Sequence, residues 1–371
     1  MSLPLIVANG TPAEIGASYG SQAATLIAGN LEDYRAKFRN LAGLDSAEVT
    51  RAGEEFRETT RKFVPRTAET LDAIADAAGI AVGDIYALNA RTELMLEGNK
   101  VTECTGLAVL PEHTASGHTL LGQNWDWYPT QAPYTILLAT QDERGHEILT
   151  LAEAGMLAKA GLNSAGVGVC VNLLGSDRDT RSGGVPYHVL IRALLDRPEG
   201  ISAALTVTAL PRSVSINMLI ATGGPHGGTA LDLELAPGAV GRLYPRDGLL
   251  SHANHFSADL PLRDRVVTDY GGSTLFREFR VRQVTADAAA DRSVSEKDLV
   301  TAFTDHVGFP HSVCRHVNPS DPEELHSLTA SSVVMDLDER RLMITDGPPC
   351  EREYRTYSLD GIFRPEFVTK P

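Results

Sequence analysis

The chain has 371 residues, and its 33 Lys and Arg against 48 Asp and Glu give a formal net charge of −15. Hydrophobic residues make up 43% and charged residues 22%, a globular balance that excludes a disordered or collagen-like chain. Nucleic acids and anionic membranes are bound through basic surfaces. Because the sequence has no dense run of Lys and Arg, we expect neither partner.

The N-terminus and the cysteines indicate a protein of the reducing cytoplasm. The opening MSLPLIVANG lacks the basic start and long apolar core of a signal peptide, and no apolar stretch approaches a membrane span. The four cysteines lack the close spacing of a disulfide framework or a zinc knuckle; they are Cys104, Cys170, Cys314 and Cys350. We therefore expect a cytoplasmic protein with no metal and no cofactor.

Residues 12–100 are predicted to be mainly helical. Leu71, Ile74 and Ala78 share one face of a helical period, and Ser46 is the expected cap of the second helix. The expected helices cover 13–27, 46–61, 67–78 and 84–96.

From Cys104 onward the sequence changes to short apolar or β-branched segments between turn residues. Expected strands lie at 106–110, 119–125, 134–141, 146–153, 163–172, 214–222, 229–235 and 249–254. Expected helices lie at 186–196, 200–208, 262–270, 273–290 and 295–307, and a closing hairpin is expected around 339–340.

This order of elements predicts an α+β fold. Strands and helices come in groups rather than in βαβ alternation, and no G-x-G-x-x-G follows a strand. The pattern favours antiparallel sheets with helices outside, a four-layer αββα sandwich preceded by a helical segment.

Cys104 stands at the boundary between the helical segment and the first strand. Most cysteines are small buried hydrophobic residues, and we interpret Cys170 in that way. A nucleophile at the head of a strand can use its own α-amine as base once the preceding peptide bond is cut. The α-amine suits this role because its pKa is about 7.7–8.0.

The segment ECTGLAVLP…GHTLLGQNWDW, which begins at Glu103, resembles the isopenicillin N acyltransferase family of the N-terminal-nucleophile hydrolases. The resemblance runs from about residue 10 to about 345 and is weakest before Cys104. Further motifs follow in the family's order: EAG at 153–155, GLNSAGV at 161–167, HANH at 252–255 and PHSVCR at 310–315.

The resemblance implies a precursor that cuts its own Glu103–Cys104 bond. The pieces 1–103 and 104–371 would stay associated as one folded unit. Cys104 would then attack an amide or thioester carbonyl, and water or an amine would resolve the acyl-enzyme. The penicillin-forming member has a glycine before its cysteine, where this chain has Glu103.

The resemblance also implies roles for other residues. Asn254 matches the asparagine of the oxyanion hole, and Asp126 and Arg315 match an aspartate and an arginine that position the amine. Apart from the resemblance, Glu153, Lys159 and Asn163 are candidates for the substrate pocket, with exposed polar residues at strand ends as the alternative, and His255 is a further candidate. The histidines at 252, 255, 311 and 316 could suggest a metal site, but the H-x-x-H spacing is a poor match to zinc and no acidic partner is fixed nearby in the sequence, so we interpret them as polar loop residues.

Several functions remain open at this point. An amidohydrolase acting on a small molecule is preferred, because water is always present and no coenzyme A signature is visible. The alternatives are an acyl-coenzyme A-dependent N-acyltransferase and an uncleaved, non-catalytic binding relative. A papain-type enzyme would need a helix-borne cysteine, whereas Cys104 is expected to head a strand. Oligomerisation stays open.

Overall fold

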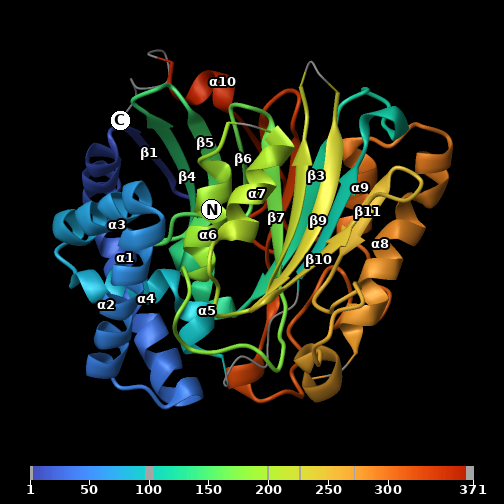
Figure 1. Cartoon of the computed structure of the whole chain (residues 1–371). Helices are drawn as coiled ribbons and strands as arrows, with labels where there is room; N and C mark the ends of the chain where they lie inside the picture. Colours follow the sequence, from blue (N-terminus) through green and yellow to red (C-terminus); the bar gives the residue numbers. More distant parts are fainter. Residues whose placement is uncertain (1–2, 97–103, 199, 225–226, 271, 365–371) are drawn as a thin grey trace.

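The computed structural model describes residues 3–96, 104–198, 200–224, 227–270 and 272–364 (Figure 1). Helices fill most of the first hundred residues, as predicted. They are α1 (Pro12–Ala42), α2 (Ser46–Phe63), α3 (Pro65–Ala78), α4 (Val82–Asn89) and α5 (Arg91–Leu94).

Two of these helices begin at capping boxes. The Thr11 side chain accepts the Glu14 backbone N–H, and the Glu14 carboxylate accepts the Thr11 N–H. Asp45, rather than the expected Ser46, caps α2 in the same way. Helix α1 runs well beyond the predicted residue 27, because its buried face continues to Phe38, and it ends at Gly43 with φ 68°.

The larger sheet carries the first strand, which the sequence did not predict. Strand β1 (Leu5–Gly10) pairs in parallel with β4, whereas the other neighbours in this sheet are antiparallel. Among the described residues the sheet order is β1-β4-β5-β6-β7-β8-β9-β10. The other strands are β4 (Thr135–Asp142), β5 (Glu147–Glu153), β6 (Gly161–Asn163), β7 (Val167–Leu173), β8 (Ile216–Thr222), β9 (Thr229–Ala236) and β10 (Ala239–Leu243).

The smaller sheet is antiparallel and contains Cys104 as the first residue of β2. Its order is β11-β2-β3-β12-β13-β14 in the described part of the chain. The strands are β2 (Cys104–Val109), β3 (Leu120–Trp127), β11 (Leu249–His252), β12 (Leu328–Asp336), β13 (Arg341–Ile344) and β14 (Arg355–Ser358). Strands β12 and β13 form the predicted closing hairpin.

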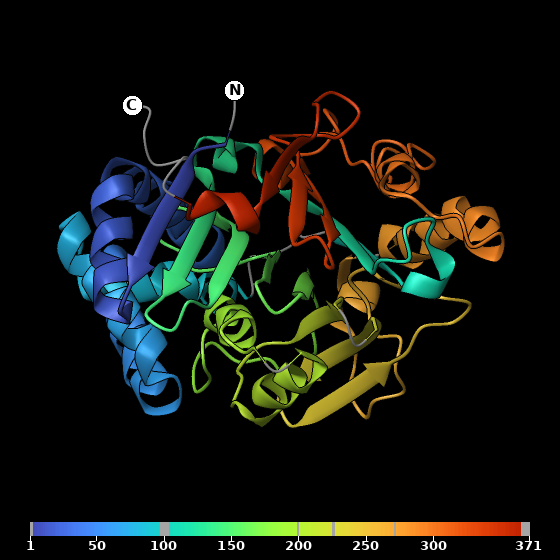
Figure 2. The ribbon, with the colours of Figure 1, turned by 90° about the horizontal axis from the view of Figure 1, so that it is seen from above.

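The two sheets stack face to face between two helical layers. Strands β2 and β3 contact β7 of the larger sheet, and α8 (Ser273–Ala290) and α9 (Glu296–Phe303) cover the other face of the smaller sheet. Helix α1 contacts β1 and β4, and α6 (Tyr187–Leu195) contacts β6 and β7. In Figure 2 the N-terminal helices (blue) and the pair α8 and α9 (orange) lie on opposite sides of the sheets. The predicted α+β, four-layer αββα arrangement is therefore confirmed.

Because β2 and β3 are covered on both faces, their sequences are not alternately polar and apolar. Every residue of β2 and β3 is buried, so neither strand shows the polar alternation of a solvent-facing sheet. One apolar cluster fills the space between the sheets and reaches the N-terminal helices, and a second lies between the smaller sheet and α8 and α9.

Several element boundaries differ from prediction. The expected strand 163–172 is two strands separated by a turn, and the expected helix 262–270 is a short π-helix at Val266–Tyr270. Helix α9 ends at Phe303 rather than at 307. Helix α7 (Ala203–Ala209) begins three residues after the expected start at 200. The sequence analysis did not predict strands β10 and β14 or the short helix α10 (Leu359–Ile362).

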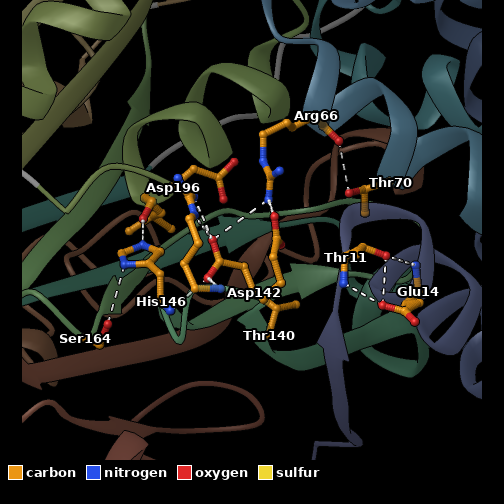
Figure 3. Close-up of polar contacts among 12 residues, drawn as sticks. Thr11, Glu14, Arg66, Thr70, Thr140, Asp142, His146, Ser164 and Asp196 are labelled. Carbon is orange, nitrogen blue, oxygen red and sulfur yellow. Dashed lines mark hydrogen bonds and ion pairs between the residues drawn. The ribbon is translucent and has the colours of Figure 1, made fainter.

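Polar contacts anchor the helices to the end of the β4–β5 hairpin (Figure 3). Arg66 near the start of α3 forms an ion pair with Glu143 at 2.8 Å, and its Nη2 lies 4.0 Å from Asp142. The ring of His146 contacts the carbonyl of Leu195 at 2.8 Å, at the end of α6. Helices α3 and α6 are thus both joined to this hairpin.

No helix within the described ranges combines the length and the apolar character that crossing a bilayer requires.

Candidate active site

Strand pairing places Asn254 beside Cys104. Strand β11 is antiparallel to β2, with Leu249 opposite Val109 and His252 opposite Gly106. Two residues further along, this register brings position 254 opposite position 104. The Cys104 backbone N–H donates to Asn254 Oδ1 at 2.7 Å, and Cys104 is only 6% exposed.

The amide of Asn254 is held in one orientation. Its Oδ1 also accepts a hydrogen bond from Arg277 Nη2 at 2.9 Å, and its Nδ2 donates to the Leu173 carbonyl at 2.9 Å. Since a guanidinium can only donate, the oxygen must face Arg277. An amide nitrogen carries two hydrogens, so one hydrogen of Nδ2 remains beyond the bond to Leu173.

Arg277 is a residue of this site that the sequence analysis missed. It is fully buried on α8, and its Nη1 donates to the Cys104 carbonyl at 2.5 Å and to Thr105 Oγ1 at 2.6 Å. The sequence did hold a signal. Arg277 occupies the buried face of α8, four residues before Val281, and a charged residue on such a face needs buried partners.

We expect Arg277→Met to lower the free energy of unfolding by about 2–4 kcal/mol, because several buried acceptors lose a charged donor. Urea denaturation of the purified variant measures this change. Arg282→Met on the same helix is the control, since the contact of Arg282 to the Arg246 carbonyl, at 3.4 Å, is exposed. Equal losses in the two variants would contradict a buried structural role for Arg277.

Asp126 and Arg315 are joined through Thr329. The Thr329 hydroxyl donates to Asp126 Oδ1 at 2.7 Å and accepts the Arg315 backbone N–H at 2.9 Å. Arg315 Nε donates to Ser327 Oγ at 2.6 Å. Asp126 directly follows Trp125, the residue paired with Cys104 across β2 and β3. The structure thus brings the predicted aspartate and arginine into one network next to the cysteine.

The surroundings of the Cys104 thiol favour its protonated form. Burial raises its pKa to about 12, and the negative charge of Asp126 adds to that shift. A thiol with this pKa needs a base before it can act as a nucleophile.

Cys104 lines a partly open pocket, where about 430 Å³ is free of protein atoms when the solvent at its mouth is included. Aromatic and aliphatic side chains form most of its walls, among them Trp125, Trp127, Leu151, Val171 and Tyr187. Two cationic side chains, Arg91 and Lys159, lie in the same walls. Lys159 Nζ is 4.2 Å from the Trp125 ring centre, and the Arg91 guanidinium is 3.8 Å from that of Trp127.

Glu153 holds the two cations from behind the pocket wall. Its carboxylate lies 2.7 Å from Lys159 Nζ and 3.3 Å from Arg91, and it accepts a 2.5 Å hydrogen bond from the Tyr34 hydroxyl. Burial opposes the charge on Glu153, but Lys159 and Arg91 outweigh it and lower its pKa. Burial, with a smaller contribution from Arg91, lowers the pKa of Lys159 to about 7. Glu153 does not line the pocket itself, but its ion pair holds Lys159 in the pocket wall.

Asn163 and His255 are not among the residues that line this pocket. The Asn163 amide donates to the Leu195 carbonyl at 2.9 Å and accepts from Val167 N at 3.1 Å, which closes the turn between β6 and β7. The His255 ring contacts Thr274 Oγ1 at 3.0 Å and lies 3.4 Å from Glu278. Glu103 lies outside the described residues.

His252 forms a buried pair with Glu234 behind Asn254. Its Nε2 lies 2.8 Å from Glu234 Oε1. Burial disfavours the charged ring, but Asp232 and Glu234 outweigh it and raise the pKa of His252 to about 9. Both ring nitrogens are engaged, because Nδ1 contacts the Ala253 carbonyl at 2.7 Å.

This pair predicts a pH-dependent contribution to stability. Since the folded pKa of about 9 exceeds the unfolded value of about 6.5, the stabilisation is fully present below about pH 6.5 and is lost as the pH rises through 9. We expect the difference in unfolding free energy between the wild type and Glu234→Gln to shrink across that window. Glu324 is exposed, so the difference in unfolding free energy between the wild type and Glu324→Gln should not change with pH across this window. A Glu234→Gln difference that grows towards pH 9 would refute the charged pair.

Comparisons with known proteins agree with the motifs of the site. A model of the family described as acyl-coenzyme A:6-aminopenicillanic acid acyl-transferase matches residues 113–349, more than half of the chain. The matched range begins after Cys104 and contains Asp126, Asn254 and Arg315. The acyl-coenzyme A:6-aminopenicillanic-acid-acyltransferase 40 kDa form of Emericella nidulans is 28% identical over 251 residues, 67% of this chain and 68% of that relative.

Two solved structures are also similar. A mutant of the conjugated bile acid hydrolase from Clostridium perfringens shares 13% identity with a TM-score of 0.44, over 69% of this chain and 92% of the other. The N-acylethanolamine-hydrolyzing acid amidase orthologue of Caenorhabditis elegans shares 15% identity with a TM-score of 0.44, over 63% of this chain and 93% of the other. On the strength of the family match, the chain belongs to the acyl-coenzyme A:6-aminopenicillanic acid acyl-transferase family.

Proposed function

We propose that this chain is an amidohydrolase whose nucleophile is Cys104, freed as an N-terminal residue by cleavage of the Glu103–Cys104 bond. The observation that carries the proposal is the position of Cys104. It begins a strand, lines a pocket, and has its backbone nitrogen held 2.7 Å from Asn254 Oδ1. If the chain were an uncleaved, non-catalytic binding protein, this position of Cys104 would have no function.

Self-cleavage is proposed as an N-to-S acyl shift. The Cys104 thiol attacks the Glu103 carbonyl, and the peptide C–N bond breaks as a thioester forms. The departing nitrogen takes up the thiol proton and becomes the α-amine of Cys104. Water then hydrolyses the thioester, which returns the thiol and leaves Glu103 as a carboxylate. The pieces 1–103 and 104–371 remain together through their shared apolar core, which joins the N-terminal helices to both sheets.

In the mature enzyme the α-amine is the proposed base. Its ordinary pKa of about 7.7–8.0 suits proton uptake from the neighbouring thiol near neutral pH. Asn254 Oδ1 already faces this nitrogen and would keep the amine oriented. The thiolate attacks the substrate carbonyl, and the remaining hydrogen of Asn254 Nδ2 would donate to the oxyanion that develops.

The pocket favours an apolar or aromatic acyl group. Trp125, Leu151 and Val171 offer apolar surface, while Arg91 and Lys159 offer positive charge to a polar or anionic group of the same substrate. The substrate is therefore proposed to be a small acyl amide. Transfer to an amine is the second candidate, because the name of the Emericella nidulans relative describes an acyltransferase that uses acyl-coenzyme A.

A substrate panel tests the proposal. Purified protein is incubated with aliphatic and aromatic acyl amides and with acyl-coenzyme A, each with and without an added amine. The proposal predicts free acid from acyl amides without an amine. Product that forms only with acyl-coenzyme A and an amine would favour the transferase. No turnover of any donor, with Cys104 unlabelled by acyl electrophiles, would favour the non-catalytic alternative.

A further inference from the structure

Outside the residues that line the Cys104 pocket, two loops bring four metal-ligand side chains together. His306, Cys314 and His316 follow α9, and Cys350 follows β13. Their ligand atoms all lie within 4.8 Å of one another. Cys314 is buried, His316 is half-buried, and His306 and Cys350 are exposed.

Four of the six separations among these atoms are close to the edges of a tetrahedron, and the two from His306 Nε2 to the sulfurs are at most 4.8 Å. The two sulfurs are 3.5 Å apart, and the two Nε2 atoms are 3.1 Å apart. His316 Nε2 lies 3.6 Å from Cys314 Sγ and 3.4 Å from Cys350 Sγ. With Zn–S of ~2.3 Å and Zn–N of ~2.0–2.1 Å, the tetrahedral edges are ~3.8 Å for S–S, ~3.3 Å for N–N and ~3.6 Å for S–N.

A carboxylate lies near the outer ring nitrogen of one of the histidines. His316 Nδ1 lies 3.5 Å from Glu351 Oε1, while its Nε2 faces the two sulfurs. A nearby carboxylate favours the tautomer with its proton on Nδ1, which leaves the lone pair of Nε2 free for a metal. Histidines that bind metals usually make such a contact through their other ring nitrogen.

Backbone hydrogen bonds hold the ligands in place. The Cys314 N–H donates to the Asp305 carbonyl at 3.0 Å, and the His316 N–H donates to the Pro310 carbonyl at 3.0 Å. The Asp305 carboxylate is in turn bound by Arg280 of α8 at 2.8 Å. The first three ligands therefore belong to one ordered loop.

We propose that His306, Cys314, His316 and Cys350 bind one Zn²⁺ ion in a closed, tetrahedral site. Two thiolates and two neutral imidazoles suit zinc, and the thiolates neutralise its charge. Because protein atoms fill all four positions, no position is left for a substrate, and the ion is structural.

The ion would stabilise the segment that reaches the Cys104 region. Arg315 lies between two of the ligands, and its backbone N–H is bound by Thr329, which also donates to Asp126. Asn124 Nδ2 ties the neighbouring carbonyl of Val313 to β3 at 2.9 Å. The zinc site thus fastens the Arg315 segment to the loop that bears Cys350.

Sequence spacing gave no sign of this site, and the proposal departs from the expectation that no metal is bound. The ligands stand at positions 306, 314, 316 and 350, far from the paired spacings of common zinc motifs. Only the packing of β13 beside β12 brings Cys350 to the other three.

Elemental analysis of tag-free protein, grown with zinc and purified without chelator, tests the proposal. We expect about one zinc ion per chain, retained in His311→Gln and lost in Cys350→Ser and His306→Gln. His311 is the matched control because it lies in the same loop but outside the cluster. A loss of zinc in His311→Gln as large as in Cys350→Ser would overturn the assignment.

Cobalt titration of the metal-stripped wild type provides a test that does not depend on how the variants fold. Tetrahedral coordination predicts visible d–d bands and a thiolate-to-cobalt charge-transfer band at one equivalent. Alkylation of the unfolded, unreduced protein should modify all four cysteines, which are free in the structure. Absence of both zinc and the cobalt spectrum, or a Cys314–Cys350 disulfide, would overturn the proposal.

Discussion

Replacement of Cys104 by Ala is expected to abolish turnover and to leave the chain at its full length of 371 residues. In the proposed mechanism the same thiol cuts the Glu103–Cys104 bond and attacks the substrate, so both reactions lose their nucleophile. Removal of a nucleophile costs roughly 10⁴–10⁶-fold in rate in enzymes of comparable design. Acyl-amide hydrolysis and denaturing electrophoresis measure the two effects.

Cys170→Ala is the matched control for this experiment. Cys170 is also a buried cysteine on a central strand, and we interpret it as a packing residue of β7. The control variant should be cleaved and active, apart from a modest loss of stability. Cleavage or full turnover in Cys104→Ala would rule out Cys104 as the nucleophile.

Replacement of Asn254 by Ala should lower kcat by about 10²–10³-fold, the typical cost of losing an oxyanion donor. The same change removes the acceptor of the Cys104 N–H and of Arg277, so we also expect a loss of about 1–3 kcal/mol in unfolding free energy. Kinetics on the folded, cleaved protein separate the two effects.

Asn254→Asp tests which part of the side chain matters. Aspartate keeps an oxygen acceptor towards Cys104 and Arg277, but an ionised carboxylate cannot donate to an oxyanion. The oxyanion role predicts that this variant is also strongly impaired. Wild-type kcat in Asn254→Asp would restrict Asn254 to orienting the nitrogen of Cys104.

Local patterns predicted the fold class and most of its elements. Helix α8 begins and ends at the predicted residues 273 and 290, and the closing hairpin is present because β-branched and apolar runs flank a turn there. Strand β1 escaped prediction because its partner in the sheet, β4, comes 125 or more residues later in the chain. Pairing at that distance leaves no local signal.

In the candidate site, the sequence predicted only residues that belong to the ordered motifs or stand next to them. The ordered motifs named Cys104 and Asn254, which the pairing of β11 with β2 brings together. Arg277 and the pocket cation Arg91 belong to no such motif and reach Cys104 only through the packing of helices on the sheets. Lys159, which the sequence offers as a pocket candidate, lines the same pocket as Cys104 and lies 2.7 Å from Glu153.

Intact-mass spectrometry of the purified wild type tests the central claim most directly. The account predicts two polypeptides, residues 1–103 and 104–371, and a single acyl group on the second after brief incubation with a reactive acyl donor. One uncleaved chain that still hydrolyses acyl amides, or an acyl group on a residue other than Cys104, would contradict the account.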